Sequence, residues 1–262
     1  MGRPDDEKVA AVWEARLESH ARLLALRNRH RDGRAFILGC GPSLSRIPPA
    51  TLSRLGYDPV VFACNYLFRW GGLPFRPSYW CASEWDHVQA IDSGLLDREH
   101  GSSWLPVPRF IASADLEGHL IRHLPAPYFE RWTLIERDMA KPITHGFLGG
   151  LHGRMPDTPE AFSGMWAATG GGVVFECAVQ LAAWMGCRDI FLLGVDAEDT
   201  GYVYDESAGA AAKRVNQYAE LRQVAKCAAE SLAIAGISLY NATPGGKLDS
   251  IQRVRLRDVL TP

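Results

Sequence analysis

Apolar side chains recur at helical spacing from Asp5 to His30, and short apolar runs separated by polar turns follow along the rest of the chain. The helical spacing predicts one helix, or two, packed on the outside of a core. The short runs predict strands at 35–38, 60–64, 79–82, 109–112 and 133–135, and again within 188–196 and 237–243.

Two longer apolar segments flank the strand predicted within 188–196. Residues 170–187, GGGVVFECAVQLAAWMGC, are apolar nearly all round and predict a buried helix that ends near Gly186. Residues 210–235 predict an amphipathic helix that ends at Gly236. RDIFLLGVD is apolar throughout, as in a strand that is covered on both faces. Because strands and helices alternate, we predict an α/β fold with a doubly wound, mostly parallel, Rossmann-like sheet.

The pattern divides the chain into an N-terminal helical extension, residues 1–34, and a Rossmann-like nucleotide-binding catalytic domain, residues 35–262. Within this domain, residues 137–166 are rich in Gly, Pro, His and Met and have no regular period. A long irregular segment inside a compact domain is usually functional. We therefore predict a small loop or lid insertion at 137–166.

The composition mainly argues against certain partners, locations and cysteine roles. The formal net charge of −2, from 28 basic and 30 acidic side chains, argues against nucleic acid as a partner. No apolar run reaches the roughly 18 residues of a membrane span, and the acidic start is unlike a secretory signal, so we expect a cytoplasmic protein. Six scattered cysteines without a CxxC pair predict reduced thiols in the core or at a pocket edge, rather than disulfides or a zinc site.

Small and polar residues follow the predicted strands, at the edge where open parallel sheets bind ligands. After the first strand come Gly39, Cys40, Gly41, Pro42 and Ser43. The glycines would let backbone N–H groups cradle a phosphate, Pro42 would fix the turn, and the Ser43 hydroxyl would donate to a phosphate oxygen. The alternative is a tight turn that needs glycine for geometry alone. The sequence is neither a GxGxxG fingerprint nor a Walker loop.

A second glycine cluster opens the predicted buried helix. Thr169 is a candidate N-cap, and free N–H groups at Gly170 and Gly171 would form another anion site. The alternative is that these glycines permit close packing against the sheet. Two further polar residues end strands, Asn65 after the second and Asp196 after the late apolar one.

Four segments together carry a resemblance to known families: RLESHARLLALRNRHRDGRAFILGCGPSLSRI, FACN, TGGGVVFECAVQLAAWMGCRDIFLLGVD and YNATPGGKLDSIQRV. In this order they resemble the bacterial 6-hydroxymethylpterin diphosphokinase-like family (domain of unknown function 115), which is related to bacterial CMP-sialic acid-dependent sialyltransferases. The middle of the chain matches poorly. The resemblance implies that the cytidine nucleotide is held by Gly41, Ser43, Asn65, Thr169 and Gly170.

The chain departs from these families at the catalytic base. The sialyltransferases use a histidine in a lid that follows the strand, whereas no histidine follows His152 here. For a sugar transfer, the remaining candidates for the base are Asp205, Glu206 and Asp86. The same segment, GVDAEDTGYVYD, carries Tyr202 and Tyr204. A matching tyrosine-bearing lid suggests that their hydroxyls lie near a phosphate, and the alternative is that the rings serve packing.

Three carboxylates are compatible with a second reaction, Mg²⁺-dependent diphosphate transfer. Glu84, Asp86 and Asp196 would coordinate Mg²⁺ across a pyrophosphate, as diphosphate transfer requires. The alternative is that Asp196 orients a neighbouring loop and that the other two are solvated.

Three hypotheses follow from these residues. The leading one is a transferase, a sialyltransferase-like glycosyltransferase that needs no cofactor. It would move an acidic sugar, of sialic acid (nonulosonate) or Kdo type, from a CMP-sugar donor to a glycan or protein acceptor. The others are a Mg²⁺-dependent diphosphotransferase that uses ATP and a non-catalytic nucleotide-binding module. Assembly into a homo-oligomer stays open.

Overall fold

The computed structural model describes residues 4–58, 60–82, 107–113, 132–136, 172–198, 201–204 and 217–260. The predicted insertion at 137–166 lies outside these ranges. Within them, no helix is both long enough and apolar enough to cross a membrane.

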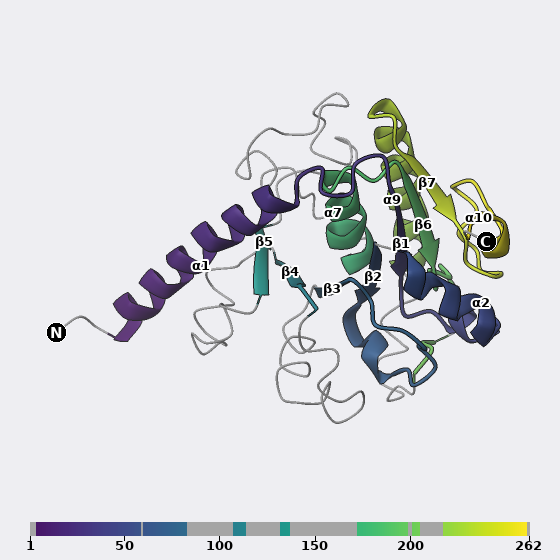
Figure 1. Ribbon diagram of the computed structural model, residues 1–262, viewed down its shortest axis with the longest axis horizontal. Helices are drawn as coiled ribbons and strands as arrows, with labels where there is room; N and C mark the ends of the chain where they lie inside the picture. Colours follow the sequence, from purple (N-terminus) through teal and green to yellow (C-terminus); the bar gives the residue numbers. More distant parts are fainter. Residues whose placement is uncertain are drawn as a thin grey trace.

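The described strands form one parallel sheet with the order β5-β4-β3-β2-β1-β6-β7 (Figure 1). The strand bounds are β1 (Arg34–Leu38), β2 (Val61–Cys64), β3 (Tyr79–Ala82), β4 (Arg109–Ser113), β5 (Trp132–Glu136), β6 (Asp189–Leu193) and β7 (Ser238–Asn241). Each strand lies where an apolar run predicts it, and the doubly wound Rossmann-like fold is confirmed.

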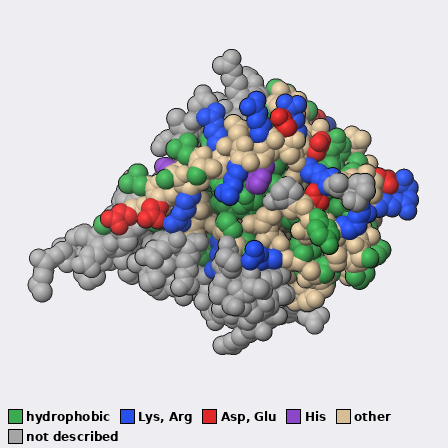
Figure 2. Space-filling model, viewed as in Figure 1, with side chains coloured by type: hydrophobic (Ala, Val, Ile, Leu, Met, Phe, Trp, Pro, Cys, Tyr) green, Lys and Arg blue, Asp and Glu red, His purple; other side chains and the backbone are tan. Residues whose placement is uncertain are grey.

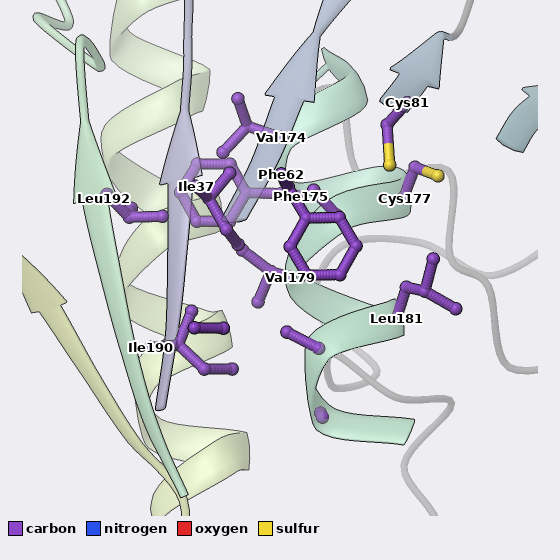
Figure 3. Close-up of a cluster of buried hydrophobic side chains, with 14 of the residues drawn as sticks. Ile37, Phe62, Cys81, Val174, Phe175, Cys177, Val179, Leu181, Ile190 and Leu192 are labelled. Atoms are coloured by element: carbon purple, nitrogen blue, oxygen red, sulfur yellow. The ribbon is translucent and has the colours of Figure 1, made fainter. Parts of the chain in front are cut away.

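The sheet is buried on both faces. Successive side chains of a strand point to opposite faces, so the strands contribute to two core clusters. In β1, Phe36 and Leu38 belong to one core cluster and Ile37 to the other. The face of Ile37 packs against the turn η9 (Val174–Ala178) and the helices α7 (Val179–Trp184) and α9 (Gln217–Ile234). Figure 3 shows Phe175 and Val179 beside the side chains of Ile37 and Phe62.

Short helices cover the opposite face. They are η1 (Pro42–Arg46), α2 (Pro49–Arg54), η2 (Leu55–Tyr57), η3 (Asn65–Arg69) and α10 (Leu256–Val259). Leu44, Leu52 and Leu256 anchor three of them in the same core cluster as Phe36. The two clusters together explain why the central strands read as continuous apolar runs.

The N-terminal helix α1 (Pro4–Leu26) is one continuous helix and lies beside the edge strand β5 (Figure 1). The Leu134 N–H of β5 donates to Ser19 Oγ at 2.9 Å, and Arg22 Nη1 donates to the Trp132 carbonyl at 3.2 Å. Polar side chains of α1 thus satisfy backbone groups at an edge where unpaired ones would otherwise invite association. The predicted position of the helix outside the core is confirmed.

The buried helix contains an irregular turn that its apolar pattern does not predict. Helical geometry is described from Gly172, and η9 is a π-helical turn in which the Val179 N–H donates to the Val174 carbonyl. Such a turn leaves a neighbouring carbonyl without its usual partner, and here Gln180 Nε2 donates to the Phe175 carbonyl at 3.0 Å. The predicted end is confirmed, because Gly186 follows the helix with φ of 86°.

All six cysteines carry free thiols, and four of them, Cys64, Cys81, Cys177 and Cys187, are buried in the core. Figure 3 shows the side chains of Cys81 and Cys177 close together. Burial raises the pKa of the Cys64 and Cys81 thiols well above their usual range and that of Cys187 to about 12. These thiols therefore stay protonated near neutral pH, where only the thiolate is a good nucleophile.

We expect the thiol reagent DTNB to modify only Cys40 and Cys227 in the native protein, because these two are partly exposed. All six thiols should react after denaturation in guanidinium chloride. The absorbance of the released thiolate, followed with time, gives the number of thiols that react in the native protein and in the denatured protein. Rapid modification of a third thiol in the native protein would contradict the core positions of the other four.

Candidate functional site

The carboxyl edge of the sheet contains a topological switch point between β1 and β6. The chain leaves β1 toward β2 on one side, and the later strands β6 and β7 lie on the other. In open parallel sheets the ligand crevice lies outside the carboxyl ends of the strands at such a point. The turn 39–43 after β1 and residues 194–197 after β6 lie at this point.

Glycines 39 and 41 are required by close backbone packing between these two segments. The Gly39 N–H donates to the Leu193 carbonyl and the Gly41 N–H to the Gly194 carbonyl, each at 2.8 Å. A Cβ on Gly39 would lie 2.5 Å from the Gly194 carbonyl oxygen. The tight-turn alternative therefore accounts for both glycines.

This packing corrects the expected phosphate cradle. The Gly39 and Gly41 N–H groups are already bonded to the carbonyls of Leu193, the last residue of β6, and Gly194, and the Ser43 N–H donates to Asp196 Oδ2 at 3.2 Å. Pro42 has no N–H to offer and begins η1, as the sequence predicts. These four residues lie at the switch point, but the backbone N–H groups of Gly39, Gly41 and Ser43 cannot bind a phosphate without breaking these bonds.

Asp196 joins the two turns that flank β6. Its side chain accepts the Ser43 N–H, and its backbone carbonyl accepts the Lys247 N–H at 2.7 Å. A Cβ on Gly41 would collide with the Asp196 carboxylate. The residue is buried, with 6% of its surface exposed. Asp196 thus orients the turn after β1, as the structural alternative from the sequence expected.

Three buried polar atoms after adjacent strands have no hydrogen-bond partner in the described structure: Ser43 Oγ, Asn65 Oδ1 and Asp196 Oδ1. They follow β1, β2 and β6, which are neighbours in the sheet. Buried polar groups are nearly always paired, so unpaired ones need an explanation such as an absent ligand. We call these three atoms the unpaired set.

Asn65 also has an unusual backbone. Its φ is 46°, in the left-handed region, which asparagine tolerates better than most residues. The residue begins η3 directly after β2. Residues held in sparsely populated conformations gather at functional sites. Asn65 therefore has two independent marks of a functional residue.

The two tyrosines predicted to lie in a lid are placed beside the turn after β1. The Val203 N–H donates to the Cys40 carbonyl at 2.8 Å and fixes the segment 201–204 there. The Tyr202 and Tyr204 rings stack with centroids 5.1 Å apart, and Tyr204 meets Tyr66 of η3 edge-on at 6.1 Å. The rings thus pack against one another and against Tyr66, and Tyr202 keeps 38% of its surface exposed.

The polar residues after β7 support the turn 243–247. Asn241 Nδ2 donates to the Leu248 carbonyl at 2.6 Å, and Asn241 Oδ1 accepts the Thr243 N–H at 2.9 Å. Arg253 Nη1 donates to the Thr243 and Gly245 carbonyls at 2.8 and 2.6 Å. This turn in turn holds Asp196 through the Lys247 N–H.

Sequence reasoning missed Arg253, because a single arginine in a polar segment carries no signal of the carbonyls that it will meet. It also missed Arg46 and Arg69, which belong to the segments after β1 and β2. Arg46 Nη1 would lie 2.8 Å from a Cβ on Gly245, and the Arg69 guanidinium lies 4.4 Å from the Tyr66 ring centroid. Within the described chain, Arg46, Arg69 and Arg253 form no ion pair with a carboxylate. On the face drawn in Figure 2, basic and acidic side chains lie interspersed.

Several predicted site residues lie outside the described residues: Thr169, Gly170, Gly171, Glu84, Asp86, Asp205 and Glu206. They include every candidate for the catalytic base and two of the three predicted Mg²⁺ ligands. The described residues contain no cluster of three or more His, Cys, Asp or Glu side chains that could hold a metal ion. The described part of the site is therefore the region around Ser43, Asn65 and Asp196.

Comparison with known proteins gives a fold but no family. No family model matches the chain, and no curated protein matches it. The MAf glycosyltransferase from Magnetospirillum magneticum AMB-1 has a similar structure, with a TM-score of 0.52 and 14% sequence identity over 98% of this chain and 39% of that one. A variant of the sialyltransferase CST-II in complex with CMP gives a TM-score of 0.49 at 16% identity, over 83% of this chain and 84% of that one. At 14% identity, the likeness to the MAf glycosyltransferase shows a shared fold.

Proposed function

We propose that this protein is a glycosyltransferase that transfers an acidic sugar, of sialic acid (nonulosonate) or Kdo type, from a CMP-sugar to a glycan or protein acceptor. The observation that carries the proposal is the unpaired set at the switch point between β1 and β6. Nucleotide ligands bind at this position in doubly wound folds. The name of the MAf glycosyltransferase, which shares the fold, supports the reaction class.

In the proposed reaction, the bond between the anomeric carbon and the phosphate oxygen breaks, and the acceptor oxygen bonds to that carbon. CMP leaves with the electron pair of the broken bond, and a base takes the acceptor proton. Asp205, Glu206 and Asp86 remain the candidates for this base. A carboxylate can serve if desolvation raises its pKa toward the working pH.

The leaving phosphate needs donors other than the backbone of the turn after β1. Tyr202 and Tyr204 lie beside that turn, because the Val203 N–H is bonded to the Cys40 carbonyl. Arg46 and Arg69 belong to η1 and η3, the segments that follow β1 and β2. Hydroxyls and guanidinium groups that meet the phosphate as negative charge develops would lower the barrier to transfer.

One observation favours a second candidate, Mg²⁺-dependent diphosphate transfer. Asp196 Oδ1 is a buried carboxylate oxygen without a partner, and carboxylates are the ligands that Mg²⁺ prefers in proteins. Glu84 and Asp86 would complete the set of ligands. Both candidate functions would use Asp196.

A thermal-shift experiment separates the candidates. We expect CMP and CDP to raise the melting temperature without added metal, and ATP and GTP to have little effect, because a bound ligand stabilises the folded state by mass action. Stabilisation by ATP only when Mg²⁺ is present would instead support diphosphate transfer. Stabilisation by CMP without turnover or slow hydrolysis of any CMP-sugar would support a non-catalytic module.

A further inference from the structure

The unpaired set differs in chemistry from a phosphate site. Asp196 offers a carboxylate, which only accepts hydrogen bonds, and its Oδ2 is already bonded to the Ser43 N–H. The Ser43 hydroxyl can donate or accept, and the Asn65 amide can turn either its oxygen or its nitrogen inward. Of the three groups, only the Asp196 carboxylate must act as an acceptor, and its Oδ1 has no hydrogen-bond donor in the described structure.

A phosphate is a poor occupant for this position. Two negative charges in a buried region repel each other, and burial strengthens the repulsion because water no longer screens it. The backbone donors that would offset this repulsion, the N–H groups of Gly39, Gly41 and Ser43, are bonded within the protein. The occupant should instead present a hydrogen-bond donor to the carboxylate.

The hydroxyls of a ribose meet that requirement. They are neutral, they donate, and in dinucleotide-binding folds an acidic residue at a strand end binds a ribose hydroxyl. In dinucleotide-binding folds the acidic residue follows a different strand of the sheet. It shares with Asp196 the carboxylate and the position at the carboxyl edge of the sheet. Ser43 Oγ can then accept from or donate to the adjacent hydroxyl of the same ring.

We propose that Asp196 binds a ribose hydroxyl of the nucleotide and makes the site selective for ribonucleotides over deoxyribonucleotides. The inference rests on the proposed function, because it takes a nucleotide as the ligand. It places the ribose against β6 at the switch point. The phosphate then lies away from the Asp196 carboxylate, toward Tyr202, Tyr204 and Arg69 of η3, which are linked through the Tyr66 ring.

The test measures the affinities of CMP, 2′-deoxy-CMP and 3′-deoxy-CMP by calorimetry, without and with Mg²⁺, for the natural protein and for Asp196→Asn. A hydrogen bond to a buried charged group corresponds to about tenfold or more in affinity. We expect at least one deoxynucleotide to bind to the natural protein at least about tenfold more weakly than CMP. In Asp196→Asn this ratio should fall to about threefold or less, because the charge-assisted bond is lost.

Glu198→Gln is the matched control. It makes the same change from carboxylate to amide two residues away, at a side chain whose Oε2 lies 3.9 Å from Lys247 Nζ. The ratio between CMP and the deoxynucleotides should be unchanged in this variant. Circular dichroism and the melting temperature of each variant confirm that it is folded before the affinities are compared.

Each other outcome overturns a defined part of the proposal. Equal binding of CMP and both deoxynucleotides to the natural protein removes the ribose contact but leaves the proposed function standing. If Asp196→Asn still binds CMP more tightly than the deoxynucleotides by the same ratio, another residue contacts the ribose and Asp196 does not. Binding of CMP that requires Mg²⁺ in the natural protein and is lost in Asp196→Asn makes Asp196 a metal ligand. Failure of all three nucleotides to bind rejects the proposed function, and this inference with it.

Discussion

Replacing Gly39 by alanine is expected to lower the free energy of unfolding by about 3 kcal/mol. The new Cβ would lie 2.5 Å from the Gly194 carbonyl oxygen and 3.2 Å from Val195 Cγ2. The first of these atoms is backbone at the end of the central strand β6, so it cannot move aside without disturbing the sheet. For a chain of this size the melting temperature should fall by roughly 6–12 °C, measured by calorimetry.

Gly71→Ala is the control for this prediction. A Cβ on Gly71 would meet no atom within 4 Å, and its φ does not lie in the left-handed region. The stability of this variant should stay within about 0.5 kcal/mol of the natural protein. If Gly39→Ala were as stable as Gly71→Ala, the close approach of the turn after β1 to β6 would be wrong, and the glycines would be free for another role.

The sequence predicts the strands well because central parallel strands are buried on both faces and therefore appear as continuous apolar runs. RDIFLLGVD is such a run, and β6 has neighbours on both sides. The pattern does not predict the order of the strands, since apolar runs carry no information about which neighbour each one takes. The switch point between β1 and β6 therefore becomes visible only in the structure.

The same limit explains the error in the glycine turn. The run Gly39-Cys40-Gly41 signals only that the backbone must come close to something. That partner is the Gly194 carbonyl, directly after β6 and far along the chain, and the sequence offers no means of pairing the two. The sequence left both a phosphate cradle and a tight turn open for these glycines, and their contact with Gly194 is visible only in the structure.

Residues without a local pattern were missed altogether. Arg253 donates to three carbonyls of the turn after β7, those of Thr243, Gly245 and Gly246. In the sequence it is one arginine among several in a polar segment. The π-helical turn at 174–178 is similar, because its residues, four of them apolar and one Glu176, would also suit an ordinary helix.

The remaining large effect concerns Ser43, whose hydroxyl has opposite consequences for stability and for binding. Without ligand, Ser43 Oγ is buried and has no partner, and such a group destabilises the folded state. Ser43→Ala removes the hydroxyl and keeps the Ser43 N–H bond to Asp196. We therefore expect the ligand-free variant to be more stable by up to about 1 kcal/mol.

The affinity of the same variant for CMP should fall by roughly tenfold, because the hydroxyl is then no longer available to the ligand. Ser45→Ala makes the same chemical change two residues away, at an exposed hydroxyl already bonded to the Pro42 carbonyl at 2.7 Å. That control should lose a little stability and bind CMP like the natural protein. Chemical denaturation and calorimetric titration of both variants test the two signs together. A Ser43→Ala protein that is less stable and binds CMP unchanged would show that the hydroxyl has a structural partner, and Ser43 would leave the site.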